Sequence, residues 1–216
     1  MNPIIFTVPV AVGLGMAGLV VAYIRAERRR NEGMARASET IGFAFTPKGD
    51  PGELKARADL PLFGNGHSRK VRNVMTGRMG GVEAQLFDYQ YTVGGGKHSH
   101  TWRQTVALLP APPGLPDFVL APENIFHKVG QRFGYQDIDF DHSPEFSSRY
   151  LLRGTDETAI RAAFSQDRLA FLAGQPGWTV ESRGAYLGIY RAGKRCRPED
   201  LPGLVADVQS VWQALR

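Results

Sequence analysis

The sequence predicts an α+β protein: an N-terminal transmembrane helix, then a mostly antiparallel, curved sheet of about seven strands with a packed C-terminal helix. Three observations predict this. Residues 3–24 contain no charged side chain. Apolar and polar side chains alternate through residues 82–109, as they do in strands with one buried face. Residues 198–215 place apolar side chains at spacings of three and four, the pattern of a helix that packs on a core.

The apolar run at the N-terminus is long enough to cross a bilayer. A helix rises about 1.5 Å per residue, so residues 3–24 extend roughly 33 Å, and the hydrocarbon core is about 30 Å thick. We therefore predict a single membrane pass within residues 1–24. The alternatives are a cleaved signal peptide, whose basic residues precede its apolar run, and a buried core helix, which is usually shorter.

Basic residues follow the apolar run and none precedes it. Arg25, Arg28, Arg29 and Arg30 come directly after it. Positive charge favours the cytoplasmic side of a membrane, so we expect the large domain to lie on that side. The four arginines are predicted to face anionic lipid headgroups. Residues 25–41 are predicted to continue the helix as a basic juxtamembrane stalk.

Small residues recur on one face of the apolar run, at Ala11, Gly15, Gly18 and Ala22. Such residues let two membrane helices approach closely, which indicates a homodimer contact. The alternative is ordinary composition, because glycine and alanine are common in membrane helices.

Composition limits the classes of function. The chain has 216 residues and a formal net charge of +5, of which the first 35 residues supply +2 through four arginines and two glutamates. The remaining excess is too small for a nucleic-acid groove, so no nucleic-acid partner is expected. A single cysteine excludes an intrachain disulfide and agrees with a reducing compartment.

Residues 42–216 form one predicted cytoplasmic domain. Glycine and proline place turns in residues 42–52, and a short helix follows at 53–58. Residues 69–77, 82–93 and 98–109 are predicted to form an antiparallel meander. The three glycines at 94–96 begin the tip of its second hairpin.

The second half of the domain is predicted to mix strands and helices. The predicted strands are 117–123, 147–154 and the hairpin 178–191, with irregular chain at 135–146. The predicted helices are 123–134, 155–164, 167–173 and 198–215, the second of them capped by Thr155 or Asp156.

The chain resembles a family of uncharacterised bacterial proteins anchored by one membrane helix. The resemblance rests on the motifs FDYQYTVGGGKHSHTWRQTV (87–106), FGYQDIDFD (133–141) and YLLRG (150–154). It implies a single-pass protein of the bacterial inner membrane with a domain of unknown function, and it supplies no catalytic residues. The meander and final helix also look like pleckstrin-homology-like or tubby-like designs, which is an analogy of fold alone.

The loop GGGKHSH is the first candidate ligand site. Its residues Gly94, Gly95, Gly96, Lys97, His98 and His100 combine accessible backbone amides with positive charge. The loop is not a phosphate-binding P-loop, because Tyr91 and His98 stand where that motif needs glycine and serine or threonine. The alternative is a plain hairpin tip.

A metal site is the weaker interpretation. His98 and His100 are two residues apart, so they share a strand face. A further ligand would have to come from another histidine or from the acids of 137–141: His67, His127, His142, Asp137, Asp139 or Asp141. The acids instead fit an exposed edge strand that buries Ile138 and Phe140. Cys196 has no histidine nearby in sequence to activate it.

The function predicted from these features is a membrane-tethered binding or scaffold module without catalysis and without a cofactor. Its expected partners are the bilayer and either a protein or anionic headgroups. The alternative is a metal-assisted hydrolase built from His98, His100 and residues 137–141.

Overall fold

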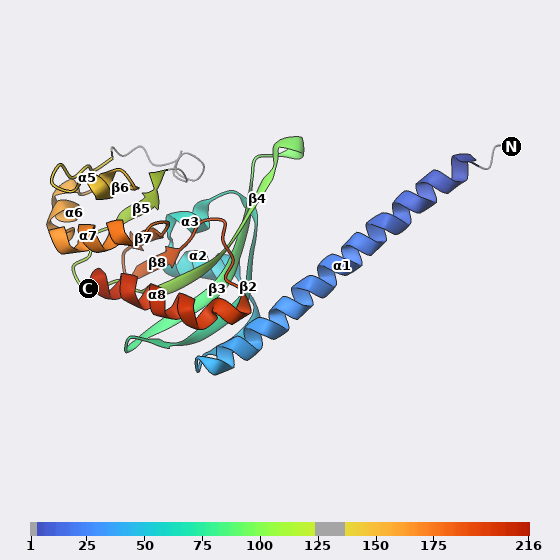
Figure 1. Cartoon of the computed structure of the whole chain (residues 1–216), viewed down its shortest axis with the longest axis horizontal. Coiled ribbons are helices and arrows are strands. Elements are labelled where there is room, and N and C mark those ends of the chain that lie inside the picture. Colours follow the sequence, from blue (N-terminus) through green and yellow to red (C-terminus); the bar gives the residue numbers. More distant parts are fainter. Residues whose placement is uncertain (1–3, 124–136) are drawn as a thin grey trace.

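One antiparallel sheet of eight strands organises the described part of the chain. The computed structural model describes residues 4–123 and 137–216, with side chains from residue 18 onward. The strand order is β1-β2-β3-β4-β8-β7-β5-β6 (Figure 1). The strands are β1 (Ala44–Gly49), β2 (His67–Met79), β3 (Val82–Val93), β4 (His100–Pro110), β5 (Phe118–Pro122), β6 (Tyr150–Gly154), β7 (Thr179–Arg183) and β8 (Tyr186–Tyr190). The predicted α+β class with an antiparallel sheet and a C-terminal helix is thus confirmed, with eight strands rather than seven.

The meander β2-β3-β4 forms the long part of the sheet. Its register pairs Gln90 with Lys70 on one side and with Arg103 on the other. A bulge interrupts β2, where Asn73 adopts a φ of +50°. Because a bulge adds one unpaired residue, it turns the following side chains to the opposite face. Arg72 and Asn73 therefore point to the same side of the sheet, toward Glu27 and Asp88 respectively.

The strand β1 corrects the prediction of turns over residues 42–52. Phe45 of β1 pairs with Met75 and Lys48 pairs with Arg72. Pro47 lies within this strand. Proline is tolerated there because β1 is an edge strand, with one side free of ladder hydrogen bonds.

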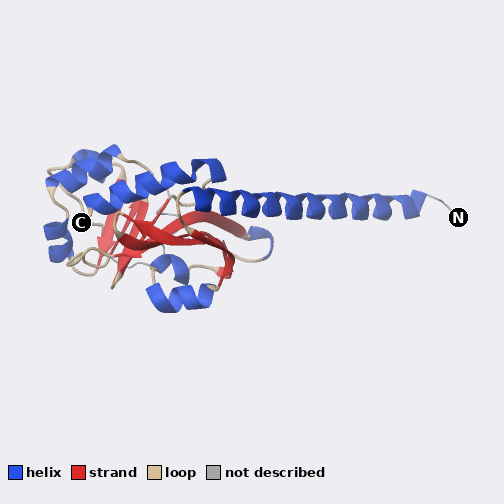
Figure 2. Cartoon of the chain, turned by 90° about the horizontal axis from the view of Figure 1, so that it is seen from below, coloured by secondary structure: helices blue, strands red, loops and turns tan. Residues whose placement is uncertain are grey.

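Helices cover both faces of the sheet (Figure 2). On one face, α8 (Leu201–Ala214), α7 (Gln166–Gly174) and the C-terminal part of α1 (Ile4–Thr40) pack on a core that includes Met34, Trp178 and Trp212. On the other face, α2 (Pro51–Ala58) and α3 (Pro61–Gly64) cover a second core of Phe63, Phe87, Tyr89 and Tyr91.

The remaining predicted helices have defined beginnings. The Asp156 carboxylate accepts a hydrogen bond from the Ala159 amide and begins α6 (Glu157–Ala163), which confirms the predicted cap. A turn of helix, α5 (Pro144–Ser147), replaces the beginning of the strand predicted at 147–154. Short 3₁₀ turns, η1 (Gly96–His98) and η2 (Pro198–Asp200), complete the set. The helix predicted at 123–134 lies outside the described residues, apart from Glu123.

Helix α1 runs without interruption through the predicted anchor and stalk and projects from the domain (Figure 1). Among the described residues, no helix has both the length and the apolar character needed to cross a membrane. The structure therefore gives the predicted span within residues 1–24 no support. Ala11 and Gly15 of the predicted dimer contact lie among the residues whose side chains are not described.

Candidate functional site

A buried ion pair joins α1 to the sheet. The Arg30 Nε and Nη2 atoms donate to the two carboxylate oxygens of Asp88, each at 2.9 Å. Asn73 Nδ2 and Thr105 Oγ1 donate to the same carboxylate at 2.9 and 2.7 Å. Only 13% of the Arg30 side chain and 7% of the Asp88 side chain are exposed. Arg30 thus pairs within the protein instead of lying free toward lipid headgroups, because it is the partner that the buried Asp88 requires.

A second set of charges lies one turn of α1 further toward its N-terminus. The Glu27 carboxylate is 3.0 Å from Arg195 Nη1 and 3.9 Å from Arg72 Nη1. Arg195 lies just beyond β8, so Glu27 links two separate parts of the domain to the helix. By contrast, Arg25, Arg28 and Arg29 are exposed.

A row of polar side chains crosses the three long strands beside this junction. Lys70, Gln90 and Arg103 are neighbours in register, and Arg103 Nε donates to Gln90 Oε1 at 3.0 Å. We call these three residues the basic row. Within the described residues, the Lys70 ammonium group has no hydrogen-bond or ion-pair partner. A shallow depression is lined by the basic row together with Glu27, Arg72, Asp88, Tyr89 and Arg195.

The charges around this depression do not cancel. The cations are Arg30, Lys70, Arg72, Arg103 and Arg195, and the carboxylates are Glu27 and Asp88. Five cations against two carboxylates leave a local net charge of +3. Since unlike charges attract across a partly desolvated surface, the depression favours an anion.

The exposed apolar side chains gather on one stretch of α1. Among the described residues, the large hydrophobic side chains that are exposed are Leu19, Val20, Val21, Tyr23 and Ile24, each 45–73% exposed. Exposed apolar surface of this continuity marks an interaction site. Its last residue, Ile24, lies within one turn of Glu27, so the apolar stretch ends where the helix meets the domain.

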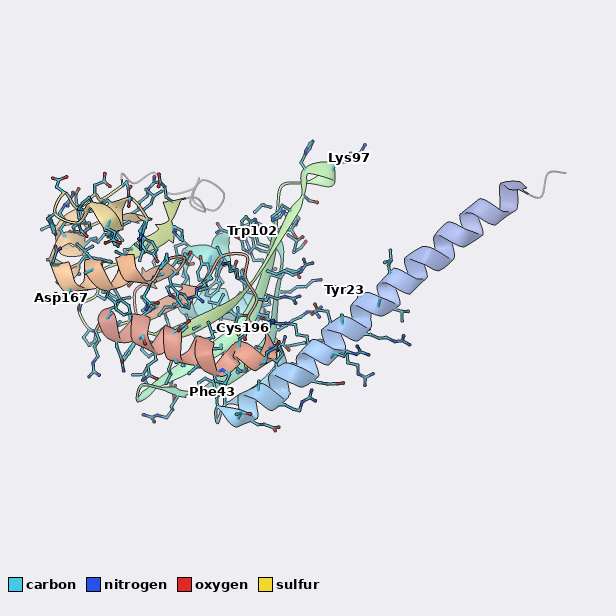
Figure 3. The ribbon with its side chains drawn as sticks, in the orientation of Figure 1. Tyr23, Phe43, Lys97, Trp102, Asp167 and Cys196 are labelled. Atoms are coloured by element: carbon cyan, nitrogen blue, oxygen red, sulfur yellow. The ribbon has the colours of Figure 1, made fainter. Side chains whose placement is uncertain are left out.

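The predicted glycine loop forms the tip of the β3–β4 hairpin, and Figure 3 shows Lys97 at that tip, away from the core. Gly94 and Gly96 have φ values of +77° and +55°, which explains the glycines at these positions. His67 Nε2 lies 3.0 Å from the Gly94 carbonyl oxygen and supports the base of the loop. The loop itself is exposed.

The predicted metal ligands are held in different places. His100 packs edge-on against Trp102, with ring centroids 5.0 Å apart. The Asp137 carboxylate accepts a hydrogen bond from the Leu152 amide at 2.9 Å, and burial raises its pKa. Ile138 and Phe140 are buried, as expected from the alternation. In the described part of the chain, no three His, Cys, Asp or Glu side chains form a group suited to a metal, and Asp139 joins neither histidine.

Cys196 lies near the junction rather than in a reactive site. Its amide donates to Thr105 Oγ1 at 2.8 Å, so it contacts the Asp88 network through that hydroxyl. Burial is the main cause that raises the pKa of its thiol to about 11. The thiolate is therefore scarce at neutral pH, and the neighbouring basic residues do not activate it.

A buried glutamate in β7 was not anticipated from the sequence. Glu181 accepts hydrogen bonds from the Leu62 amide at 2.9 Å and from the Tyr190 hydroxyl at 2.8 Å. It is 2% exposed, and burial raises its pKa to about 7. Neither of these hydrogen-bond donors is a cation, so the carboxyl group is held by neutral donors alone.

A cleft lies between α8 and the segment after β8, with a volume of about 510 Å³. Its charged side chains pair with one another: Arg191 lies 3.4 Å from Asp207, and the lining carboxylate of Asp200 lies 2.8 Å from Arg197. Because these charges are compensated, the cleft has a weaker preference for a charged ligand than the basic depression.

Comparison with known proteins shows a likeness of fold. No protein-family model matches the chain, and no match is found among curated proteins. The resemblance to membrane-anchored bacterial proteins therefore stays a prediction. The crystal structure of the mycobacterial trehalose monomycolate transport factor A, TtfA, is similar to this chain with a TM-score of 0.62. The two are 16% identical, and the match covers 89% of this chain and 97% of TtfA.

Proposed function

We propose that this protein is a membrane-tethered binding module with a lipid-related role and without catalysis. The observation that carries the proposal is the exposed apolar stretch Leu19–Ile24, which continues an uncharged N-terminal sequence and is followed by exposed arginines. An apolar helix flanked by basic residues favours insertion into lipid. The fold shared with a protein named for the transport of a mycolate lipid supports the same class of role.

The domain is proposed to lie on the cytoplasmic side of the membrane. Arg25, Arg28 and Arg29 follow the apolar stretch, and basic residues favour the cytoplasmic side. The domain would then lie at the inner face of the bacterial membrane, with these arginines near anionic headgroups. A contact between two copies through Gly18 and Ala22 remains a further expectation of this arrangement.

The metal-assisted hydrolase is not proposed. His98, His100 and residues 137–141 do not come together in the described structure. A hydrolase needs a positioned nucleophile and an oriented base within hydrogen-bond reach, and the described contacts of these residues are structural.

Flotation of the full chain with neutral phosphatidylcholine vesicles tests the tether. We expect the protein to float and to resist extraction by high salt, since apolar burial is not screened by ions. Replacing Leu19 and Val21 together by aspartate should weaken flotation, because a charge within a membrane helix costs up to about 3 kcal/mol, the cost being highest at the helix centre.

Arg36→Asp is the matched control, because it adds an aspartate at an exposed site near the other end of the same helix. It should float like the unmodified chain. A full chain that stays at the bottom of the gradient would exclude the tether, and digestion of the domain by protease added outside intact cells would exclude the cytoplasmic side.

A further inference from the structure

The inner face of α1 and the basic row face the same space. Met34, Arg30 and Glu27 contact the domain, and their spacing of four and three defines one face of the helix. Two further steps of four and three along that face reach Tyr23 and Val20, which are 50% and 56% exposed. The contacting face of α1 therefore becomes apolar where the helix leaves the domain.

This face of α1 lies next to the part of the β2-β3-β4 meander that runs from Asp88 to the hairpin tip. Toward the hairpin tip, the buried row with Asp88 is followed by the basic row and then by Thr92 and Thr101, whose hydroxyls lie 3.0 Å apart. Figure 1 shows α1 and the β3–β4 hairpin running apart from their junction. At that junction Glu27 and the basic row line the same depression, so its polar, positive lining lies one helical turn from Tyr23.

We propose that this depression, together with the apolar face of α1 next to Glu27, binds the phosphate headgroup of an anionic phospholipid. The phosphate would lie against Lys70 and Arg103, and the acyl chains would run along Val20 and Tyr23. Three observations favour this occupant: the local net charge of +3 at the depression, the Lys70 ammonium group, which is unpaired within the described residues, and the apolar face of α1 that begins one turn from Glu27. A guanidinium and an ammonium side by side are a common set of phosphate donors.

The position of the site along the helix agrees with this occupant. A phospholipid carries its charge at one end, so its recognition requires cations at the level where the apolar face begins. Glu27 lies between the cations of the depression and the apolar face of α1. Its carboxylate is paired with Arg195 and Arg72, which reduces its repulsion of a phosphate. This inference rests on the proposed tether, because the apolar face belongs to the same helix.

The test uses the full chain in nanodiscs of phosphatidylcholine, with and without phosphatidylglycerol. Lysine reactivity with an amine-acylating reagent is followed by mass spectrometry at Lys70 and at Lys55. Lys55 is a reference because it lies on α2, on the opposite face of the sheet. We expect phosphatidylglycerol to slow acylation of Lys70 about five-fold, as one favourable charge contact predicts, and to leave Lys55 unchanged.

Equal acylation of Lys70 in both kinds of nanodisc would overturn the site while leaving the tether intact. Failure of the chain to co-elute with neutral nanodiscs would instead refute the tether. Equal protection by inorganic phosphate in neutral nanodiscs would show a free-phosphate site and overturn the assignment to lipid.

A pair of variants provides a second readout, the amount of phosphatidylglycerol retained in native mass spectrometry. Lys70→Gln combined with Arg103→Gln should lose the retained lipid. Lys55→Gln combined with Arg57→Gln removes the same charge from α2 and should retain it. Retention by both double variants would also overturn the site.

Discussion

Removal of the Arg30 guanidinium is expected to destabilise the domain strongly. Arg30→Gln would leave the Asp88 carboxylate 7% exposed and without its cation. Breaking a buried pair from one side costs about 3–5 kcal/mol. Asn73 and Thr105 still donate to Asp88 in the variant, so we expect the lower value, about 3 kcal/mol. For a domain of this size, that loss lowers Tm by about 6–12 °C.

The assay is thermal unfolding of the purified full chain in detergent micelles, followed by far-ultraviolet circular dichroism. Arg28→Gln is the matched control on the same helix. The Arg28 side chain is 82% exposed, and its nearest carboxylate, Glu32, is 3.5 Å away. An exposed pair of this kind contributes less than about 1 kcal/mol, so the control should unfold near the temperature of the unmodified chain.

A double-mutant cycle separates the ion pair from other effects of the substitution. Asp88→Asn alone leaves Arg30 buried and unpaired, while the combination with Arg30→Gln removes both charges. We expect the free energy of unfolding lost in the double variant to be smaller than the sum of the two single losses by about 1–3 kcal/mol. Additive losses, or an Arg30→Gln variant within about 1 kcal/mol of the original, would refute the argument that this pair fastens α1.

Three further outcomes are expected. The pKa of Glu181 is raised in the folded state to about 7 from 4.5, so the folded state binds the proton more tightly and stability falls as pH rises from about 4.5 through 7. Glu181→Gln, which can still pair with Tyr190, should remove that dependence and be the more stable form at pH 8 in urea titrations; an unchanged pH profile would contradict this. His98→Ala combined with His100→Ala should leave the metal content unchanged and should change the free energy of unfolding by less than about 0.5 kcal/mol. Loss of a stoichiometric metal in this variant would instead support the metal-assisted hydrolase. Alkylation of Cys196 at pH 7.4 should be about 10-fold slower in the folded chain than in urea, because burial raises its pKa from 9.0 to about 11 and the loss of thiolate outweighs the gain in its nucleophilicity; equal rates would show an exposed, ordinary thiol.

Local patterns were enough to predict most of the elements. The alternation at Phe87, Tyr89 and Tyr91 predicted one buried face, and all three side chains are 1% exposed or less. The stripe of α8 was found in the same way, with Val208 and Val211 both buried. β1 was missed because Pro47 and its neighbours favour turns, and only its pairing with β2 makes the segment a strand.

The polar sites depended on contacts that sequence spacing does not reveal. Arg30 and Asp88 are 58 residues apart, and Asp88 lies on the face of β3 that alternation assigns to solvent. Glu181 was missed for a related reason: an antiparallel sheet usually leaves one face wet, but helices cover both faces of this one. Both carboxylates are buried by distant segments, so no local pattern marks them.

The way α1 is fastened makes the helix and the sheet one rigid unit. Contacts with the domain extend over three turns, from Glu27 through Arg30 and Gly33, which packs on Pro198, to the fully buried Met34 and Ser38. A helix held at several points cannot rotate independently of the sheet, unlike a helix joined by a flexible linker. The direction in which the apolar half of α1 enters a bilayer would therefore also fix the direction of β2, β3 and β4. The buried ion pair at the junction contributes to this coupling, and loss of Arg30 would loosen the helix from the sheet. If α1 is the proposed tether, the basic row would then no longer be held at a fixed level relative to the headgroups.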